Sequence, residues 1–222
     1  MSTAMSVDKS PAALIRRLSM GGLDSGSWPA IREICRRTGN NGEPIAPERQ
    51  ELFVRVWIEP YEKILPYWTY VAEQNGTIVG YLTGCPDSKA FNRTKRWRCT
   101  LPLLLTLALG AYRRTPGARD LAVQQLGIRK TAEQSFSRRV HRDIARFYPA
   151  HLHMNVEREF RRTGIGRRLQ ASYFADLRRD GVRGIHLFCG ADPLPFYLRV
   201  GFQMLEKSRF HDVEVFALGQ RL

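Results

Sequence analysis

The chain has few cysteines, and none of them are closely spaced. Cys35, Cys85, Cys99 and Cys189 are the four cysteines among 222 residues, and no C-x-x-C pair occurs. Disulfide-stabilised secreted domains and zinc ribbons need such pairs or regular spacings. We therefore expect free thiols, no bound metal and a reducing, cytoplasmic location.

Long apolar segments are also missing. The best run, residues 101–110, is about half the roughly 20 residues needed to span a bilayer, and it contains Pro102. The first ten residues are small or polar and lack the uninterrupted apolar stretch of a signal peptide. We expect no membrane span and a flexible N-terminus at 1–10.

Acidic residues are scarce, with 21 against 35 lysines and arginines, so the formal net charge is +14 and the pI is about 10.2. Many of the arginines fall in one region: Arg93, Arg96, Arg98, Arg113, Arg114, Arg119, Arg138, Arg139, Arg142 and Arg146. Nucleic acid or an acidic partner could bind there. No zinc-finger, RNP or homeodomain motif appears, so a solvated basic surface is the favoured interpretation.

The length and the hydrophobic content of 43% suit one sizeable domain. We predict a single domain at 11–222 with a basic, partly helical insertion at about 91–147. Periodicity predicts a strand at 12–18, helices at 27–39 and 48–57, and strands at 68–73 and 77–83. Ser27 is the expected cap of the first helix. Asn75-Gly76 predicts a tight hairpin between the last two strands.

The richest pattern lies between residues 151 and 202. Leu152 and Met154 alternate with polar neighbours as in a strand, and Ile165, Leu169, Tyr173 and Leu177 then form one stripe of a helix. This helix is expected to end at Asp180-Gly181. The sequence therefore predicts a strand, a turn and a helix in succession.

Gly164 and Gly166 stand where this helix begins. The first backbone N–H groups of a helix have no partner within it, and the helix dipole is positive at that end. Glycines let phosphate oxygens approach such groups, and Arg161, Arg162, Arg167 and Arg168 add positive charge. A diphosphate suits this site; the alternative is that the glycines only start the helix tightly.

Two motifs at the right separation resemble a known family. R-x-x-G-x-G at 161–166, followed by F-Y-x-x-x-G-F at 196–202, is similar to the acetyl-CoA-binding half of GCN5-related N-acetyltransferases (GNATs). The segments 148–153 and 87–91, together with His186, more narrowly resemble bacterial acetyltransferases similar to the C-terminal domain of O-GlcNAc hydrolase. The resemblance implies an α/β fold with a central mixed, twisted sheet of about six to seven strands flanked by helices.

The resemblance also implies a function: direct transfer of an acetyl group from acetyl-CoA to a primary amine of a small molecule or a protein. The implied cofactor-binding residues are Met154, Val156, Arg161, Arg162, Thr163, Gly164, Ile165, Gly166 and Arg167. The backbone of Met154 and Val156 would pair with the pantetheine arm, and the Val156 N–H would hold the oxyanion. Tyr197 matches the family's general acid.

The resemblance does not identify a general base for the acceptor amine. Relatives commonly carry Asp after the motif H-L-H-x, whereas this chain has Asn155, which cannot act as a carboxylate base. We predict His153 and Asn155 as pocket residues, so that Tyr197, Asn155 and His153 are the catalytic candidates. His151, His153 and His186 could instead bind a metal, but no acidic or cysteine partner accompanies them.

Three features leave alternatives open. Asn155, and Pro195 in the short helix that Asp192 is expected to cap, favour a catalytically weak or inactive acyl-CoA-binding pseudo-acetyltransferase or interaction module. The basic surface allows a third hypothesis, an interaction protein that uses the fold as a scaffold. The apolar segment 101–112 could cover the acceptor cleft, form a homodimer or touch a membrane surface, with the core or dimer interpretation favoured.

Overall fold

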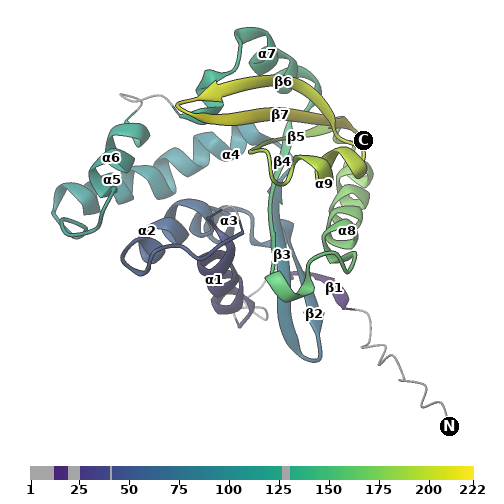
Figure 1. Ribbon diagram of the computed structural model, residues 1–222, viewed down its shortest axis with the longest axis horizontal. Helices are drawn as coiled ribbons and strands as arrows, with labels where there is room; N and C mark the ends of the chain where they lie inside the picture. Colours follow the sequence, from purple (N-terminus) through teal and green to yellow (C-terminus); the bar gives the residue numbers. More distant parts are fainter. Residues whose placement is uncertain (1–12, 20–25, 41, 127–130) are drawn as a thin grey trace.

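A seven-stranded mixed sheet runs through the protein (Figure 1). The computed structural model describes residues 13–19, 26–40, 42–126 and 131–222. The strands are β1 Leu14–Arg17, β2 Thr69–Gln74, β3 Thr77–Cys85, β4 Ala150–Val156, β5 Gly184–Cys189, β6 Gln203–Phe210 and β7 Val213–Arg221. Their spatial order is β1-β2-β3-β4-β5-β7-β6. Only β4 and β5 pair in parallel; every other neighbouring pair is antiparallel.

Helices cover both faces of this sheet (Figure 1). They are α1 Ser27–Thr38, α2 Pro47–Trp57, α3 Glu59–Ile64, α4 Ser88–Lys95, α5 Leu101–Ala108, α6 Ala118–Gln125, α7 Arg138–Phe147, α8 Ile165–Arg179 and α9 Leu194–Arg199. None of the described helices is both long enough and apolar enough to cross a bilayer. The α/β class and the strand number expected from the sequence are confirmed.

The local sequence signals explain most element boundaries. Asn75 and Gly76 both have positive φ, 52° and 73°, as a two-residue hairpin turn requires. Pro47 starts α2 because proline fits the first helical turn, where its missing N–H costs nothing. The predicted opening strand is shorter than expected, Leu14–Arg17, and Ala12 lies outside the described residues.

The expected cap at Ser27 was wrong. Gly26 occupies the cap position, no side chain caps this end, and Ser27 is the first helical residue. The Ser27 side chain is buried, and its Oγ accepts a hydrogen bond from Arg16 Nη2 at 3.2 Å. A tertiary contact with β1 therefore uses the hydroxyl that local reasoning assigned to the helix.

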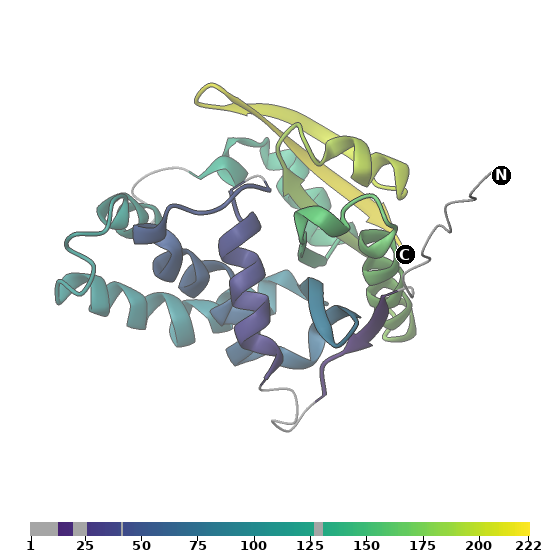
Figure 2. The same cartoon turned by 60° about the horizontal axis from the view of Figure 1, so that its bottom comes forward.

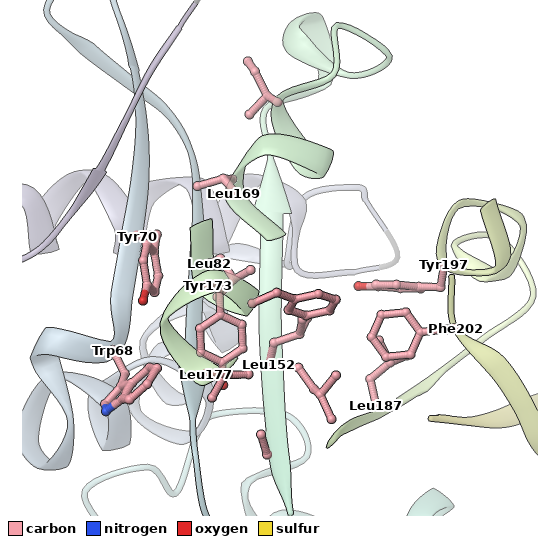
Figure 3. Close-up of a cluster of buried hydrophobic side chains, with 14 of the residues drawn as sticks. Trp68, Tyr70, Leu82, Leu152, Leu169, Tyr173, Leu177, Leu187, Tyr197 and Phe202 are labelled. Atoms are coloured by element: carbon pink, nitrogen blue, oxygen red, sulfur yellow. The ribbon is translucent and has the colours of Figure 1, made fainter. Parts of the chain in front are cut away.

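The main core lies between the sheet and α8 (Figure 3). Leu169, Tyr173 and Leu177, the stripe predicted from the sequence, are fully buried there. Trp68 and Tyr70 from the β2 side meet Tyr173 edge to face, with ring centroids 5.7 Å apart in each pair. This contact fixes α8, and with it the turn that precedes the helix, against the middle of the sheet.

The opposite face is covered in two parts. A second core packs α1, α2 and α3 over β2 and β3, and a separate cluster packs α7 over β5 and β7. Between them the chain from 88 to 126 forms an arm of α4, a π-helical turn at Arg96–Thr100, α5 and α6. Leu103 and Tyr112 anchor this arm to Leu52 of α2. Pro102 accounts for the π-turn, because it has no N–H to continue the α-helical ladder.

Candidate functional site

The two parallel strands separate at the centre of the sheet. β4 and β5 pair only at Ala150 with Ile185 and at His151 with His186, although β4 continues to Val156. Between Leu152 and Val156 the edge of β4 that faces β5 therefore has no partner strand among the described residues. An extended ligand with amide groups could pair with this edge as a strand would.

The register determines which backbone groups point into this gap. The Glu157 N–H donates to Val79 O at 2.9 Å, and hydrogen-bonded pairs alternate along an antiparallel ladder. Residues 151, 153 and 155 consequently direct their backbone polar groups to β3. Met154 and Val156 direct theirs to the gap, where Val156 O accepts from Arg161 Nε at 3.0 Å.

The predicted glycine turn lies at the N-terminus of α8. Gly164 is at the cap position with φ of 86°, and nothing lies within 4 Å of the point where a Cβ would stand. A Cβ at Gly166 would be 3.3 Å from Phe196 and 3.5 Å from Met154, so a larger side chain there meets α9 and β4. Ile165 is buried in the main core, and Thr163 Oγ1 donates to Phe160 O at 2.7 Å. Thr163 and Gly164 are exposed, and no side chain caps this end of α8, so its first N–H groups are left without a side-chain partner among the described residues.

The flanking arginines divide into two pairs. Arg161 binds the backbone carbonyls of Val156 and Gly42, and Arg168 binds that of Ala13, so these two secure the turn. Arg162 and Arg167 are exposed, and neither has a hydrogen bond or an ion pair within the described residues. The latter pair provides the positive charge that is free to meet an anion at this helix end.

Tyr197 lies on α9, on the same face of the sheet as α8. Its ring is buried with Phe202 at a centroid distance of 5.5 Å. Figure 3 shows the ring extending from α9 toward the strand that carries Leu152, with its hydroxyl at the tip. Burial raises the pKa of Tyr197, chiefly by desolvation, so its hydroxyl stays protonated. A protonated phenol beside the gap can donate a proton.

The expected cap of α9 was wrong by one residue. Pro193 occupies the cap position, no side chain bonds to the helix end, and Pro195 falls in the first turn. Both prolines are accommodated before any N–H is required for the helical ladder. Pro195 therefore does not break the helix, and Tyr197 is held in regular geometry.

His153 and Asn155 lie on the opposite face, together with two residues that the sequence did not single out as site residues, Tyr81 and Trp57. Tyr81 Oη is 3.1 Å from His153 Nε2 and accepts from Asn155 Nδ2 at 2.9 Å. The Trp57 ring is 43% exposed and stacks on His153, with centroids 5.8 Å apart. Burial, and secondarily the charge of Lys95, lowers the pKa of His153 to about 4, so the ring is neutral at neutral pH. The four side chains form a half-open aromatic and amide-lined surface beside the gap, named the acceptor-side cluster below.

His151 belongs to a separate, buried network. Its Nε2 is 2.8 Å from Tyr61 Oη, and its Nδ1 is 2.7 Å from Ser88 Oγ, which itself donates to Pro149 O. Burial lowers the pKa of His151 to about 3, and the neighbouring His186 adds to the effect. His186 Nδ1 lies 2.6 Å from Tyr148 O. Within the described residues no group of three or more His, Cys, Asp or Glu side chains is arranged to hold a metal ion.

Tyr81 and Trp57 could have been found only in part from the sequence. Tyr81 lies in the strand expected at 77–83, and its pairing with Asn155 follows once β3 and β4 are placed side by side. Trp57 ends α2, almost a hundred residues before His153, and no periodic signal links the two. Long-range packing alone brings Trp57 to the site.

Known structures share this architecture, although a comparison of the sequence with known protein families gives no match. The structure of SsHAT is 25% identical, with a TM-score of 0.70, and the alignment covers 95% of this chain and 98% of that one. A GCN5-related N-acetyltransferase from Kribbella flavida is 17% identical with a TM-score of 0.53, over 95% and 98% of the two chains. The putative acetyltransferase yncA from Salmonella typhimurium, solved with acetyl-CoA, is 14% identical with a TM-score of 0.53, over 96% and 95%.

The splayed parallel strands, the glycine turn at the start of α8 and these structural matches agree with the sequence resemblance. The chain therefore has the fold of the GCN5-related N-acetyltransferases.

Proposed function

We propose that the protein is a cytoplasmic enzyme that transfers the acetyl group of acetyl-CoA directly to a primary amine of a small molecule or a protein. The observation that carries the proposal is the unpaired edge of β4, which leads to the exposed N–H groups at the start of α8. An edge strand suits the pantetheine amides, and a helix N-terminus suits the pyrophosphate. The acetyl-CoA in the similar yncA structure supports this donor.

In this proposal the cofactor residues act in sequence along the gap. Met154 and Val156 would pair with the pantetheine arm, the backbone of 163–166 would hold the pyrophosphate, and Arg162 and Arg167 would meet its charge. A cofactor bound along β4 and the 163–166 turn would have its thioester beside the unpaired part of β4. The Val156 N–H is the expected donor to the carbonyl oxygen as negative charge develops there.

The transfer itself needs two proton movements. The amine nitrogen attacks the thioester carbon, a C–N bond forms, the C–S bond breaks and the coenzyme leaves as a thiolate. Tyr197 donates its proton to that thiolate and regains one from solvent. The amine loses its proton to water, because the amide of Asn155 cannot accept it and a histidine of pKa about 4 is a poor base at neutral pH.

The acceptor is expected on the face that carries the acceptor-side cluster. Neutral His153 and the Asn155 amide can hydrogen-bond to an amine without repelling its cationic form. The exposed Trp57 ring can stack on an acceptor or attract its positive charge. Tyr197 and the cluster would thus act on the thioester from opposite faces of the sheet.

Ligand-dependent stability tests the donor site. A ligand that binds only the folded state raises the thermal midpoint; at a hundredfold excess over Kd it contributes about 2.7 kcal/mol. We expect acetyl-CoA and coenzyme A to raise the midpoint of the wild-type protein, and Gly164→Asp to abolish the rise by placing a carboxylate at the phosphate position. No rise at saturating acetyl-CoA would sink the proposal.

Gly181→Asp is the matched control. Gly181 follows the other end of α8, has φ of 70°, and likewise has nothing within 4 Å of a built Cβ. The two variants therefore introduce the same charge and similar backbone strain. Equal loss of the ligand effect in both would show that strain, rather than the phosphate position, is responsible.

Asn155 favours a second candidate, an acyl-CoA-binding protein with little or no turnover. Its amide binds Tyr81, and no carboxylate replaces it in the acceptor-side cluster. Acetyl transfer to a panel of amines separates the two functions, with thiol release as the readout. If the second candidate holds, the wild-type protein binds acetyl-CoA without turnover and Asn155→Asp gains activity; turnover by the wild-type protein excludes it.

A further inference from the structure

The outer face of α5 is apolar and uncovered. Every residue of this helix except Thr106 is apolar, a composition typical of a helix that is surrounded by other elements. Only Leu103 is buried, with the half-buried Leu107 beside it facing α2. The helix therefore packs on one side alone.

The uncovered residues form a line along the arm. Trp97 is 68% exposed, Leu105 is 66% exposed and Leu109 is 87% exposed, and the half-buried Leu101 lies between them. Residues four apart lie on the same side of a helix, so the four side chains form a continuous strip, named the arm ridge. Both views place α5 and α6 at the end of the molecule far from the C-terminus (Figures 1 and 2). The ridge thus lies on an outlying segment.

The charge around the arm ridge has one sign. Residues 88–119 contain eight lysines and arginines and no acidic residue. The nearest of them are Arg93, Arg96, Arg98, Arg113 and Arg114, all exposed, and none forms an ion pair within the part of the chain that the structure describes. A partner for this surface must bring both apolar area and negative charge.

The need for both apolar area and negative charge distinguishes among three kinds of partner. A second copy of the chain would bring a ridge with eight further positive charges, which repel the first. A nucleic acid supplies the negative charge, but its phosphate backbone leaves the leucines uncovered. The interface of an anionic bilayer supplies both, since Leu and Trp enter the acyl boundary while arginines stay among the headgroups.

We propose that the arm ridge and its flanking arginines bind the surface of anionic lipid membranes. The arm would lie in the interface with Leu109 and the Arg113-Arg114 turn at its tip, and the rest of the protein would stay in water. This peripheral contact does not depend on acetyl-CoA. It would hold the acyltransferase beside amines presented at the membrane surface.

Vesicle sedimentation tests the proposal. The full chain is mixed with vesicles of phosphatidylcholine alone or with 30% phosphatidylglycerol, on the order of the anionic content that attracts basic segments. We expect binding to the anionic vesicles only, with a blue shift of Trp97 fluorescence that is lost in Trp97→Phe. Absence of sedimentation with the anionic vesicles would overturn the proposal.

Two variants identify the surface. Leu105→Gln combined with Leu109→Gln is expected to weaken vesicle binding at least tenfold, and Arg113→Gln combined with Arg114→Gln to weaken it several-fold and to reduce its salt dependence. Val213→Gln, a change at an equally apolar position 58% exposed on β7, is the control and should bind like the wild type. Binding that is equal in all three variants would overturn the assignment to the arm.

Two further readouts address the other partners and the independence from catalysis. Light scattering should show a monomer whose mass the double leucine variant does not change, and a dimer that this variant dissociates would overturn the proposal. Displacement of the protein from vesicles by short duplex DNA at equal charge would do the same. Gly164→Asp should still bind vesicles, so failure of the donor site and failure of the membrane surface are distinguishable.

Discussion

The two faces of the central gap are built in different ways. On the α8 face, the glycine turn, α8 and Tyr197 all come from the single stretch 161–197, and local sequence signals form each of them. Contacts with distant segments then fix the turn and α8 against the sheet. On the other face, Trp57, Tyr81 and His153 come from three separate segments and meet only through packing. The face proposed to bind the acyl donor thus forms from neighbouring parts of the sequence, whereas the face proposed to bind the acceptor depends on packing between distant segments.

This difference predicts separable effects of mutation, and the largest is expected on the α8 face. Tyr197→Phe removes the proposed acid and should lower kcat by about a hundredfold, since acid catalysis typically contributes at least that much. The acetyl-CoA-dependent thermal shift should remain. Tyr81→Phe, which removes a hydroxyl on the other face, is the comparison and should act mainly on KM for the amine. A kcat unchanged in Tyr197→Phe contradicts the assigned role.

The second effect concerns acid stability and lies on the acceptor face. The folded-state pKa of His153 is lowered to about 4 from 6.5. Below pH 6.5 the unfolded state takes up a proton on this histidine and the folded state does not, so the free energy of unfolding falls as the pH is lowered. The stabilisation is therefore fully present above pH 6.5, and on the order of 3 kcal/mol of it is lost as the pH falls toward 4. Urea unfolding from pH 7 to 4.5 measures it.

In the same experiment His153→Gln should lose less stability between pH 6.5 and 4.5 than the wild-type protein. His211→Gln, a change at an exposed histidine on the β6–β7 turn, is the control. It should follow the wild-type curve. Parallel curves for His153→Gln and the wild type would mean that His153 is not the origin of the pH dependence.

A smaller effect distinguishes the two arginine pairs of the donor side. Arg162→Gln and Arg167→Gln should each reduce the affinity for coenzyme A several-fold at low salt and much less at high salt, because exposed charges are screened. Arg161→Gln should instead lower stability, since its bonds to Val156 and Gly42 hold the turn. Calorimetric titration at two salt concentrations, with thermal midpoints, separates these outcomes.

The smallest expected effect is at Trp57. Replacing this half-exposed ring with leucine should raise KM for the amine a few-fold and leave both kcat and coenzyme A affinity unchanged. Phe53→Leu is the control, because the Phe53 ring contacts Trp57, with centroids 6.0 Å apart, whereas the ring contacts of His153 within the described residues are with Trp57 and Tyr81. Equal effects of both changes would assign Trp57 to packing alone.

The sequence by itself determined the turn and the helix of the proposed donor side, because the signals for these elements are short-range. Gly164 needs a positive φ, the stripe from Ile165 to Leu177 needs a buried helix face, and Asn75-Gly76 needs a hairpin; each requirement is met within a few residues. The resemblance carried by residues 161–166 and 196–202 then predicted the fold, which the similar solved structures share. Even so, only the structure divided the arginines, because the partners of Arg161 and Arg168 are backbone carbonyls on distant segments.

Tertiary structure alone decided the rest. Ser27 became a partner of Arg16 instead of a cap, Trp57 came to lie on His153, and His151 was enclosed by Tyr61 and Ser88. The periodicity of the sequence predicts none of these contacts, since each depends on which helix covers which part of the sheet. The uncovered side of α5 follows the same rule: the sequence shows that the helix is apolar, and only the fold shows which side is left exposed.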